Sequence, residues 1–184
     1  MNYVQGNKSL YWTAYKNDGS VWIQGFVRKS ENLRQVKKLI TEAMKIAHRN
    51  DFPRGEVFTK LEFPQEWGWG SSSSLTSLIA QWFSIDALEL HFKTSNGSGY
   101  DVACAMAQQP IFYRRLSNNI EITPIKLNQW PTANMYFQYL GKKKESSEAV
   151  KEYNKKPIQN IEAFTRLTED MFKASKIKTL INLV

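Results

Sequence analysis

The chain has 184 residues, a length that suits one large domain or two small ones. Apolar residues make up 42% and aromatic residues 13%, which argues against wholesale disorder. No apolar run approaches the ~18 residues of a membrane-spanning helix, and the N-terminus lacks the features of a secretory signal. The single cysteine, Cys104, cannot form an internal disulfide and is expected to pack in the core. These features predict a cytoplasmic protein with no membrane partner.

The net charge of +8 and the pI of about 9.5 predict attraction to anions. The anion could be a nucleic acid, an acidic membrane surface or a phosphorylated small molecule. Lysines and arginines are scattered along the chain, and Lys142-Lys143-Lys144 is the only tight cluster. Scattered charges are typical of solvated surfaces, so charge alone does not choose among these partners.

The sequence pattern of the first part of the chain predicts a hairpin, a helix and a strand. Residues 10–27 predict two strands, because Asp18-Gly19 between β-rich runs is a hairpin signal. Residues 31–50 predict a helix that ends before Pro53. Residues 56–63 alternate between apolar and polar side chains, as in a half-buried strand. The expected apolar face of the helix consists of Leu33, Val36, Ile40, Ala43 and Ala47.

The remaining elements alternate between helices and short strands. Helices are predicted at residues 72–83, 85–93, 100–108, 146–154 and 158–174, and strands at 111–116, 120–127 and 135–140. This mixture indicates an α+β fold rather than a doubly wound parallel sheet. Trp130-Pro131 is the expected domain boundary, which gives domains at 1–130 and 131–184.

A glycine-serine loop lies between the predicted strand and the helix at 72–83. It runs from Pro64 through Gly68-Trp69-Gly70 to Ser71-Ser72-Ser73. A strand, a glycine turn and a helix N-terminus together present free N–H groups to an anion, and the serine hydroxyls can bind phosphate oxygens or Mg²⁺. No lysine follows the glycines, so this is not a Walker A loop. A plain helix cap is the alternative interpretation.

A second glycine loop, Gly97-Ser98-Gly99, leads to Asp101 in the first turn of a predicted helix. A carboxylate at this position can accept a proton from a hydroxyl nucleophile. Alternatively, Asp101 stabilises the helix through its dipole.

Together the two loops resemble motifs of the GHMP kinase superfamily. Pro64, Gly68, Gly70, Ser71 and Ser72 match the phosphate-binding pattern P-x-x-x-G-L-G-S-S-A-A, with Trp69 in place of leucine. Ser98, Gly99 and Asp101 match the G-x-P-S-G-x-D pattern of mevalonate kinases, with Gly97 at the proline position. The stretch Gly-Tyr-Asp-Val-Ala is similar to the signature of a bacterial subgroup, the GYDIA family.

The resemblance implies a two-domain fold, with a ribosomal protein S5 domain 2-like N-terminal part and the start of a ferredoxin-like C-terminal part. It implies an ATP-dependent kinase of a small hydroxyl-bearing metabolite such as mevalonate. Residues 64 and 68–73 would bind ATP, Ser72 would hold Mg²⁺, Ser98 and Gly99 would form the substrate loop, and Asp101 would be the catalytic base. The family's magnesium-binding glutamate corresponds to Leu90, beside Glu89.

The family's first and third motifs are absent from this chain. We therefore expect it to be truncated at both ends and to have little or no kinase activity by itself. No nucleic-acid partner is expected, and the oligomeric state cannot be inferred. The alternative function is a non-catalytic binding module, either a degenerate kinase or a basic nucleic-acid-binding protein.

Overall fold

In the computed structural model, residues 1–116, 119–125, 136–139, 141, 151–153, 155 and 160–174 are described. The chain divides into two units, Met1–Pro124 and Ile125–Val184. The predicted boundary at Trp130-Pro131 and the cluster Lys142-Lys143-Lys144 lie outside the described residues.

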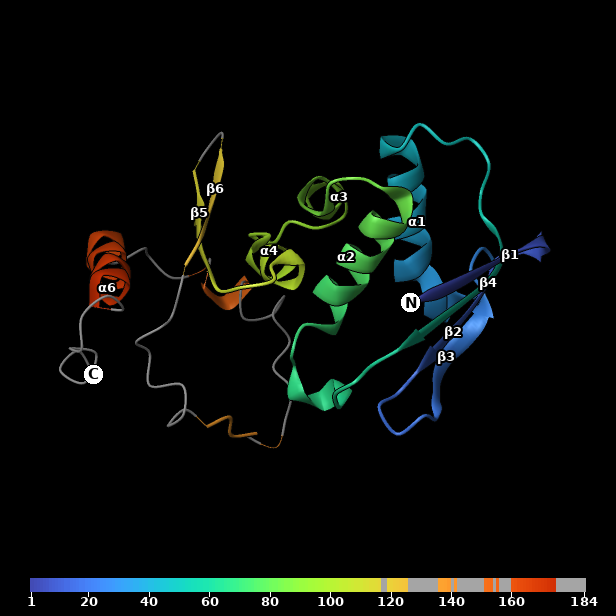
Figure 1. The fold of residues 1–184 in the computed structure, drawn as a ribbon, viewed down its shortest axis with the longest axis horizontal. Coiled ribbons are helices and arrows are strands. Elements are labelled where there is room, and N and C mark those ends of the chain that lie inside the picture. The colour runs from blue at the N-terminus through green and yellow to red at the C-terminus, as the bar shows by residue number, and fades with distance from the viewer. Residues whose placement is uncertain are drawn as a thin grey trace. The chain divides into compact units, whose positions relative to one another are not determined.

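The first unit begins with a sheet whose described strands have the order β1-β4-β2-β3 (Figure 1). Its strands are β1 (Asn2–Ser9), β2 (Tyr11–Tyr15), β3 (Val21–Phe26) and β4 (Arg54–Lys60). β2 and β3 form the predicted hairpin, where Asp18 accepts hydrogen bonds from the N–H (2.8 Å) and hydroxyl (2.7 Å) of Ser20. β4 runs parallel to β2 and antiparallel to β1. Between β3 and β4 the chain passes through a 3-10 helix and the first α-helix, and β4 joins the sheet on the other side of β2 from β3.

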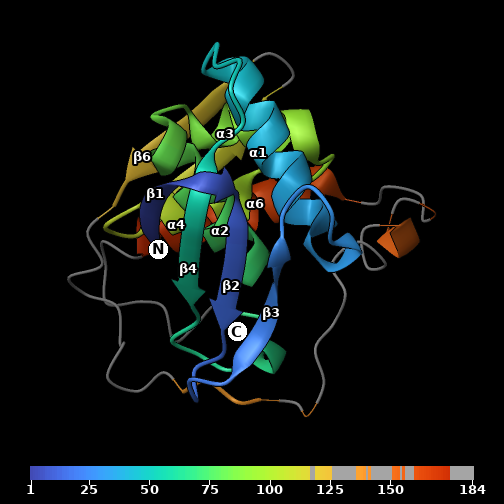
Figure 2. The same cartoon turned by 90° about the vertical axis from the view of Figure 1, so that its right-hand side faces the viewer.

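The described helices of this unit pack beside the sheet and against one another. They are η1 (Glu31–Leu33), α1 (Arg34–Ile46), η2 (Gln65–Trp67), α2 (Ser71–Phe83), α3 (Ala87–Thr94) and α4 (Tyr100–Met106). Figures 1 and 2 show α1 and α2 next to the sheet and α3 and α4 on the side away from it. A second described sheet, the hairpin β5 (Ile111–Arg115) and β6 (Ile120–Pro124), follows α4. This mixture confirms the predicted α+β class at a coarse level.

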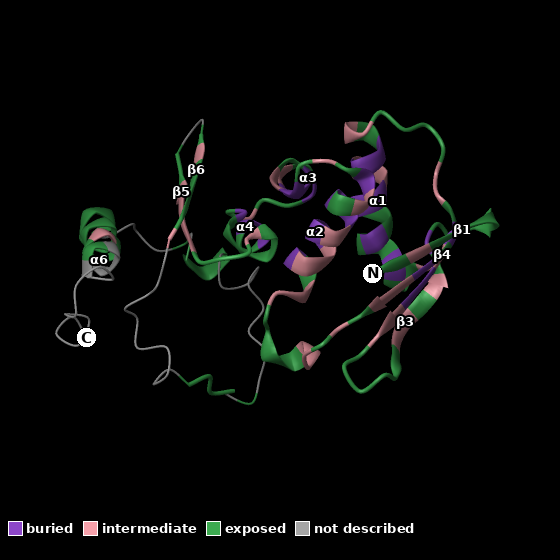
Figure 3. Cartoon of the chain, viewed as in Figure 1, coloured by how far each residue is buried: buried purple, intermediate pink, exposed green. Residues whose placement is uncertain are grey.

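The hydrophobic core lies between the four-stranded sheet and the helices (Figure 3). Trp12 and Val57 come from the sheet, while Ile40 and Ile79 come from α1 and α2; each is at most 1% exposed. Burying a side chain of this kind contributes about 1.5–3 kcal/mol. The core therefore holds α2, and with it the glycine loop that precedes it, against the sheet.

In the second unit, α6 (Ile161–Ala174) and the helical residues 151–153 lie within two predicted helices. The strand predicted at 135–140 is wrong, because the described residues Tyr136–Tyr139 adopt no regular secondary structure. Pairing with a neighbouring strand, which sequence alternation cannot supply, is what turns an extended segment into a β-strand.

Candidate functional site

The glycine loop has a specific backbone shape. Gly68 (φ 72°, ψ 22°) ends η2 in the left-handed region, and Gly70 (φ 85°, ψ 37°) precedes α2 in the same region. A Cβ atom on Gly70 would lie 2.7 Å from the Oγ of Ser73, which is too close for a real contact. Pro64, at the start of the loop, adopts φ −59°. Glycine is therefore required at position 70 for both conformation and space.

The N-terminus of α2 has no side-chain cap. The hydroxyl of Ser73 donates a hydrogen bond to the carbonyl of Gly70 (2.8 Å), and the N–H of Ser74 donates to the same oxygen (2.9 Å). Among the described residues, none accepts a hydrogen bond from the backbone N–H groups of Ser71, Ser72 or Ser73. These three groups and the positive end of the helix dipole can therefore receive an anion.

The three serines differ in what their side chains can do. Ser72 is exposed and Ser71 is half-buried, so their hydroxyls can reach a ligand. Ser73 is only 4% exposed, and its hydroxyl is already bound to the Gly70 carbonyl. The side chain of Ser73 thus stabilises the turn, and only its backbone N–H remains for phosphate.

Ser71, Ser72 and Ser74 line a cavity of about 560 Å³ between α2, the start of α1 and the sheet. This volume lies in the range of small-molecule sites. Trp22 and Phe63 supply apolar surface to its wall, and Lys60 and Glu62 supply charged groups. A ligand in this cavity would lie beside the uncapped N-terminus of α2.

Two further aromatic side chains extend from the loop. The rings of Trp67 and Trp69 meet edge to face with centroids 4.7 Å apart, and Trp69 lies 5.7 Å from the cavity residue Phe63. Trp67 is 37% exposed and Trp69 is 47% exposed. Trp69, which replaces the expected leucine, therefore adds to an aromatic surface that begins in the cavity.

The second loop leads directly into α4. Gly99 (φ 84°) precedes the helix, and the Oγ of Ser98 accepts a hydrogen bond from the N–H of Tyr100 at 3.3 Å. Asp101 is exposed in the first helical turn, and its Oδ1 accepts a hydrogen bond from the N–H of Val102 at 3.0 Å. Among the described residues, no Lys, Arg or His forms an ion pair with Asp101. Its carboxylate is thus accessible to a hydroxyl substrate.

Strand β5 holds this loop in place. The hydroxyl of Tyr113 donates to the carbonyl of Ser98 (2.6 Å), and the guanidinium of Arg115 donates to the carbonyl of Gly97 (3.0 Å). Arg115 also lies over the ring of Phe92, 4.7 Å from its centre. A Cβ on Gly99 would lie 2.9 Å from Phe92, so the close approach of the loop to α3 requires glycine at this position. Tyr113 and Arg115 were not among the predicted site residues, because nothing in the strand pattern indicates their hydrogen-bond partners.

Asp101 and Tyr113 interact electrostatically. Burial raises the pKa of the Tyr113 hydroxyl, and the nearby carboxylate of Asp101 raises it further, while Arg115 lowers it. At the start of α4, the pKa of Tyr100 is raised, first by its hydrogen bond with Cys104, then by the charge of that thiol and by burial. Cys104 is exposed, so the prediction that it packs in the core is wrong. It lies on the solvent side of α4, whereas Val102 and Ala103 face inward.

The predicted site residues form two separate groups, one around each glycine loop. α2 and α4 pack against each other, but Ser98, Gly99 and Asp101 are not among the residues that line the cavity beside Ser72. Glu89 is exposed in the first turn of α3, whereas Leu90 is fully buried. No cluster of three or more His, Cys, Asp or Glu side chains that could hold a metal occurs within the described ranges.

No family model, curated protein or solved structure matches this chain. In the part of the chain that the structure describes, no helix is both long and apolar enough to cross a membrane.

Proposed function

We propose that the chain binds Mg·ATP at the N-terminus of α2 and belongs to a GHMP-type kinase, which transfers the γ-phosphoryl group to a small, mevalonate-like hydroxyl compound. The observation that carries the proposal is the uncapped start of α2, which follows two left-handed glycines and opens on a cavity of about 560 Å³. A helix that is closed by its own side chains would not need this arrangement. The finer assignment, a two-domain GHMP fold, is part of the same proposal.

The phosphate groups would lie against the N–H groups of Ser71, Ser72 and Ser73. These donors are fixed by the helix before the ligand arrives, so they stabilise negative charge without reorganising. The exposed rings of Trp67 and Trp69 and the cavity residue Phe63 would supply apolar surface for the base.

The donors present fit a hydrated Mg²⁺ ion. Mg²⁺ keeps several waters and binds one or two protein oxygens together with the substrate phosphates. The hydroxyl of Ser72 supplies one such oxygen, and the carboxylate of Glu62 lines the same cavity. When bound, the ion would neutralise charge on the phosphates.

Asp101 would act as the general base. Its accessible carboxylate would accept the proton of the substrate hydroxyl while the hydroxyl oxygen forms a bond to the γ-phosphorus. The bond from that phosphorus to the β–γ bridging oxygen would break, and ADP would leave. Tyr113 and Arg115 would be positioning residues, because they hold the loop that carries Asp101.

Calorimetric titration with Mg·ATP tests the nucleotide site. We expect saturable binding that Ser72→Ala weakens by about tenfold, the loss of one charge-assisted contact. Ser30→Ala is the matched control, because Ser30 makes no side-chain cap and does not line the cavity beside Ser72. Equal affinity of the two variants would contradict the assignment of Ser72.

Asp101→Asn separates catalysis from binding. This variant should keep the Mg·ATP affinity of the parent chain, because Asp101 lies outside the cavity beside Ser72. Any phosphoryl transfer measured with a panel of hydroxyl-bearing metabolites should fall by about 100-fold or more. A basic nucleic-acid-binding module, the alternative function, would instead bind single-stranded RNA with a steep salt dependence and without preference for ATP.

A further inference from the structure

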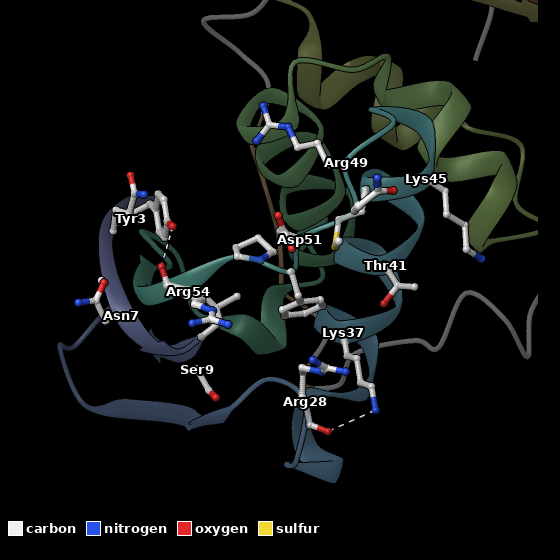
Figure 4. Close-up of a pocket in the computed structure, with 17 residues that line it drawn as sticks. Tyr3, Asn7, Ser9, Arg28, Lys37, Thr41, Lys45, Arg49, Asp51 and Arg54 are labelled. Atoms are coloured by element: carbon white, nitrogen blue, oxygen red, sulfur yellow. Dashed lines mark hydrogen bonds between the residues drawn. The ribbon is translucent and has the colours of Figure 1, made fainter.

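A second and larger cavity, of about 1150 Å³, lies between α1, β1 and the start of β4 (Figure 4). It shares no lining residue with the cavity beside Ser72. Neither loop motif contributes to it, so the proposed kinase site does not explain it.

Positive charge dominates the lining of this cavity, which we call the basic hollow. Its cationic residues are Arg28, Lys37, Lys45, Arg49 and Arg54. Asp51 is the one carboxylate among the lining residues. Lys45 is paired with Glu42 at 2.6 Å, but among the described residues no carboxylate lies within ion-pair distance of the other four cations. Like charges that line one cavity without counter-ions raise the local potential and attract anions.

The cations come from separate elements that the fold brings together. Arg28 follows β3, Lys37 lies on α1, and Arg54 begins β4. In Figure 4 Arg28 and Lys37 lie together, and the ammonium of Lys37 donates to the carbonyl of Arg28 at 3.3 Å. The same figure shows Lys45 and Arg49 pointing away from this pair.

Local contacts position the side chain of Arg28 and the backbone of Arg54. The guanidinium of Arg28 lies over the ring of Phe52, 5.4 Å from its centre. The backbone carbonyl of Arg54 accepts a hydrogen bond from the hydroxyl of Tyr3 at 2.7 Å. A guanidinium group can bind phosphate oxygens through two parallel hydrogen bonds. Asn7, Ser9 and Thr41 add neutral polar groups to the same lining.

The shape and the aromatic residues favour a small ligand over a nucleic acid. Single-stranded nucleic acid binds along a charged groove that also offers aromatic faces for base stacking. Here Arg28, Lys37 and Arg54 line one hollow. Its two aromatic side chains, Tyr3 and Phe52, are both half-buried. Arg28 covers one face of Phe52, and the hydroxyl of Tyr3 is bound to the backbone. The hollow offers charge without a stacking platform.

We propose that the basic hollow is a second binding site, which takes a small ligand carrying two or more phosphate groups. Arg28 and Arg54 bind one phosphate group each, and Lys37 supplies further positive charge beside Arg28. A single phosphate cannot engage cations from three elements as fully as a chain of phosphates can. The site is independent of the proposed nucleotide site at α2.

Sodium tripolyphosphate is the probe, and calorimetry measures its binding at an ionic strength of about 0.15 M, where the Debye length is about 8 Å. We expect one saturable site at the hollow, whose affinity falls by at least about tenfold in the double variant Arg28→Gln/Arg54→Gln. The control Lys8→Gln/Lys16→Gln removes the same charge from exposed residues outside the hollow. Because salt screens distant charges, the control should change the affinity by no more than about twofold. Thermal melts of both variants establish that they are folded.

Three outcomes overturn the inference. Equal weakening by both double variants would mean that only net charge attracts the probe. Loss of tripolyphosphate binding in Ser72→Ala alone would place the probe at α2 rather than in the hollow. Tighter binding of a single-stranded RNA oligonucleotide, lost in Arg28→Gln/Arg54→Gln, would make the ligand a nucleic acid. The inference is supported if Arg28→Gln/Arg54→Gln weakens tripolyphosphate binding and Ser72→Ala binds the probe as tightly as the parent chain does. This support holds even if Mg·ATP fails to bind at α2.

Discussion

Replacing Gly70 with alanine should destabilise the chain in two separable ways. The backbone at Gly70 has φ 85°, and a left-handed conformation costs a non-glycine residue about 1–2 kcal/mol. The new Cβ would also lie 2.7 Å from the Oγ of Ser73 and would disturb the hydrogen bond to the Gly70 carbonyl. Loss of that bond adds about 1 kcal/mol, for a total of about 2–3 kcal/mol.

Gly19→Ala is the matched control. Gly19 has φ 86°, nearly the same conformation, but a Cβ there would have no neighbour within 4 Å. Urea unfolding should therefore show a loss of about 1–2 kcal/mol for Gly19→Ala and a larger loss for Gly70→Ala. In a Ser73→Ala background the extra cost at Gly70 should disappear, because the clashing oxygen is gone. The described loop geometry is wrong if Gly70→Ala lowers the unfolding free energy no more than Gly19→Ala does. It is also wrong if the Ser73→Ala background leaves the loss caused by Gly70→Ala unchanged.

Three further predictions concern the packing and the titrating groups. Gly55 has φ 124°, and a Cβ there would collide with the carbonyl of Val4, so Gly55→Ala should release β1 and speed amide hydrogen exchange in that strand; unchanged exchange would contradict the β1–β4 pairing. The pKa of Tyr113 is raised in the folded chain, so its contribution to stability is complete below about pH 10 and is lost as pH rises through the folded pKa. Tyr113→Phe should therefore make the unfolding free energy fall less steeply at alkaline pH. Near neutral pH the same variant should be less stable by about 0.5–1.5 kcal/mol, because it loses the hydrogen bond to Ser98. An unchanged alkaline slope would contradict the role of Tyr113. Hydrogen bonds from the Ser20 hydroxyl and N–H lower the pKa of Asp18, so the contribution of Asp18 to stability is present above pH 3.8 and is lost as pH falls through the folded pKa. The unfolding free energy of Asp18→Asn should therefore fall less steeply with acid than that of the parent chain. An identical fall in both proteins would mean that Asp18 does not contribute to the acid dependence.

Local patterns predicted most elements of the first unit. The apolar period of residues 31–50 correctly placed Leu33, in η1, and Val36, Ile40 and Ala43, in α1, in the core. The Asp18-Gly19 turn signal correctly located the β2–β3 hairpin. These signals succeed because burial of one helix face and turn chemistry are both encoded over a few neighbouring residues.

Contacts between distant segments could not be predicted. β1 was missed, because nearly all of its residues are exposed and only its pairing with β4, some fifty residues later, makes it a strand. The same limit applies to the site. The positive φ of Gly68 and Gly70 follows from residue type, whereas the support of Ser98 by Tyr113 depends on how β5 folds back. The inward direction of the Ser73 hydroxyl likewise emerges only from the helix geometry.

The central claim, that the start of α2 holds nucleotide phosphate, is tested most directly by amide chemical shifts during a titration with Mg·ATP. We expect the N–H signals of Ser71, Ser72 and Ser73 to move together and saturate, because these groups lack protein acceptors in the described part of the chain. Adenosine, which lacks phosphate, should leave them nearly unchanged. Saturable binding of Mg·ATP that moves other amides and leaves these three in place would contradict the claim.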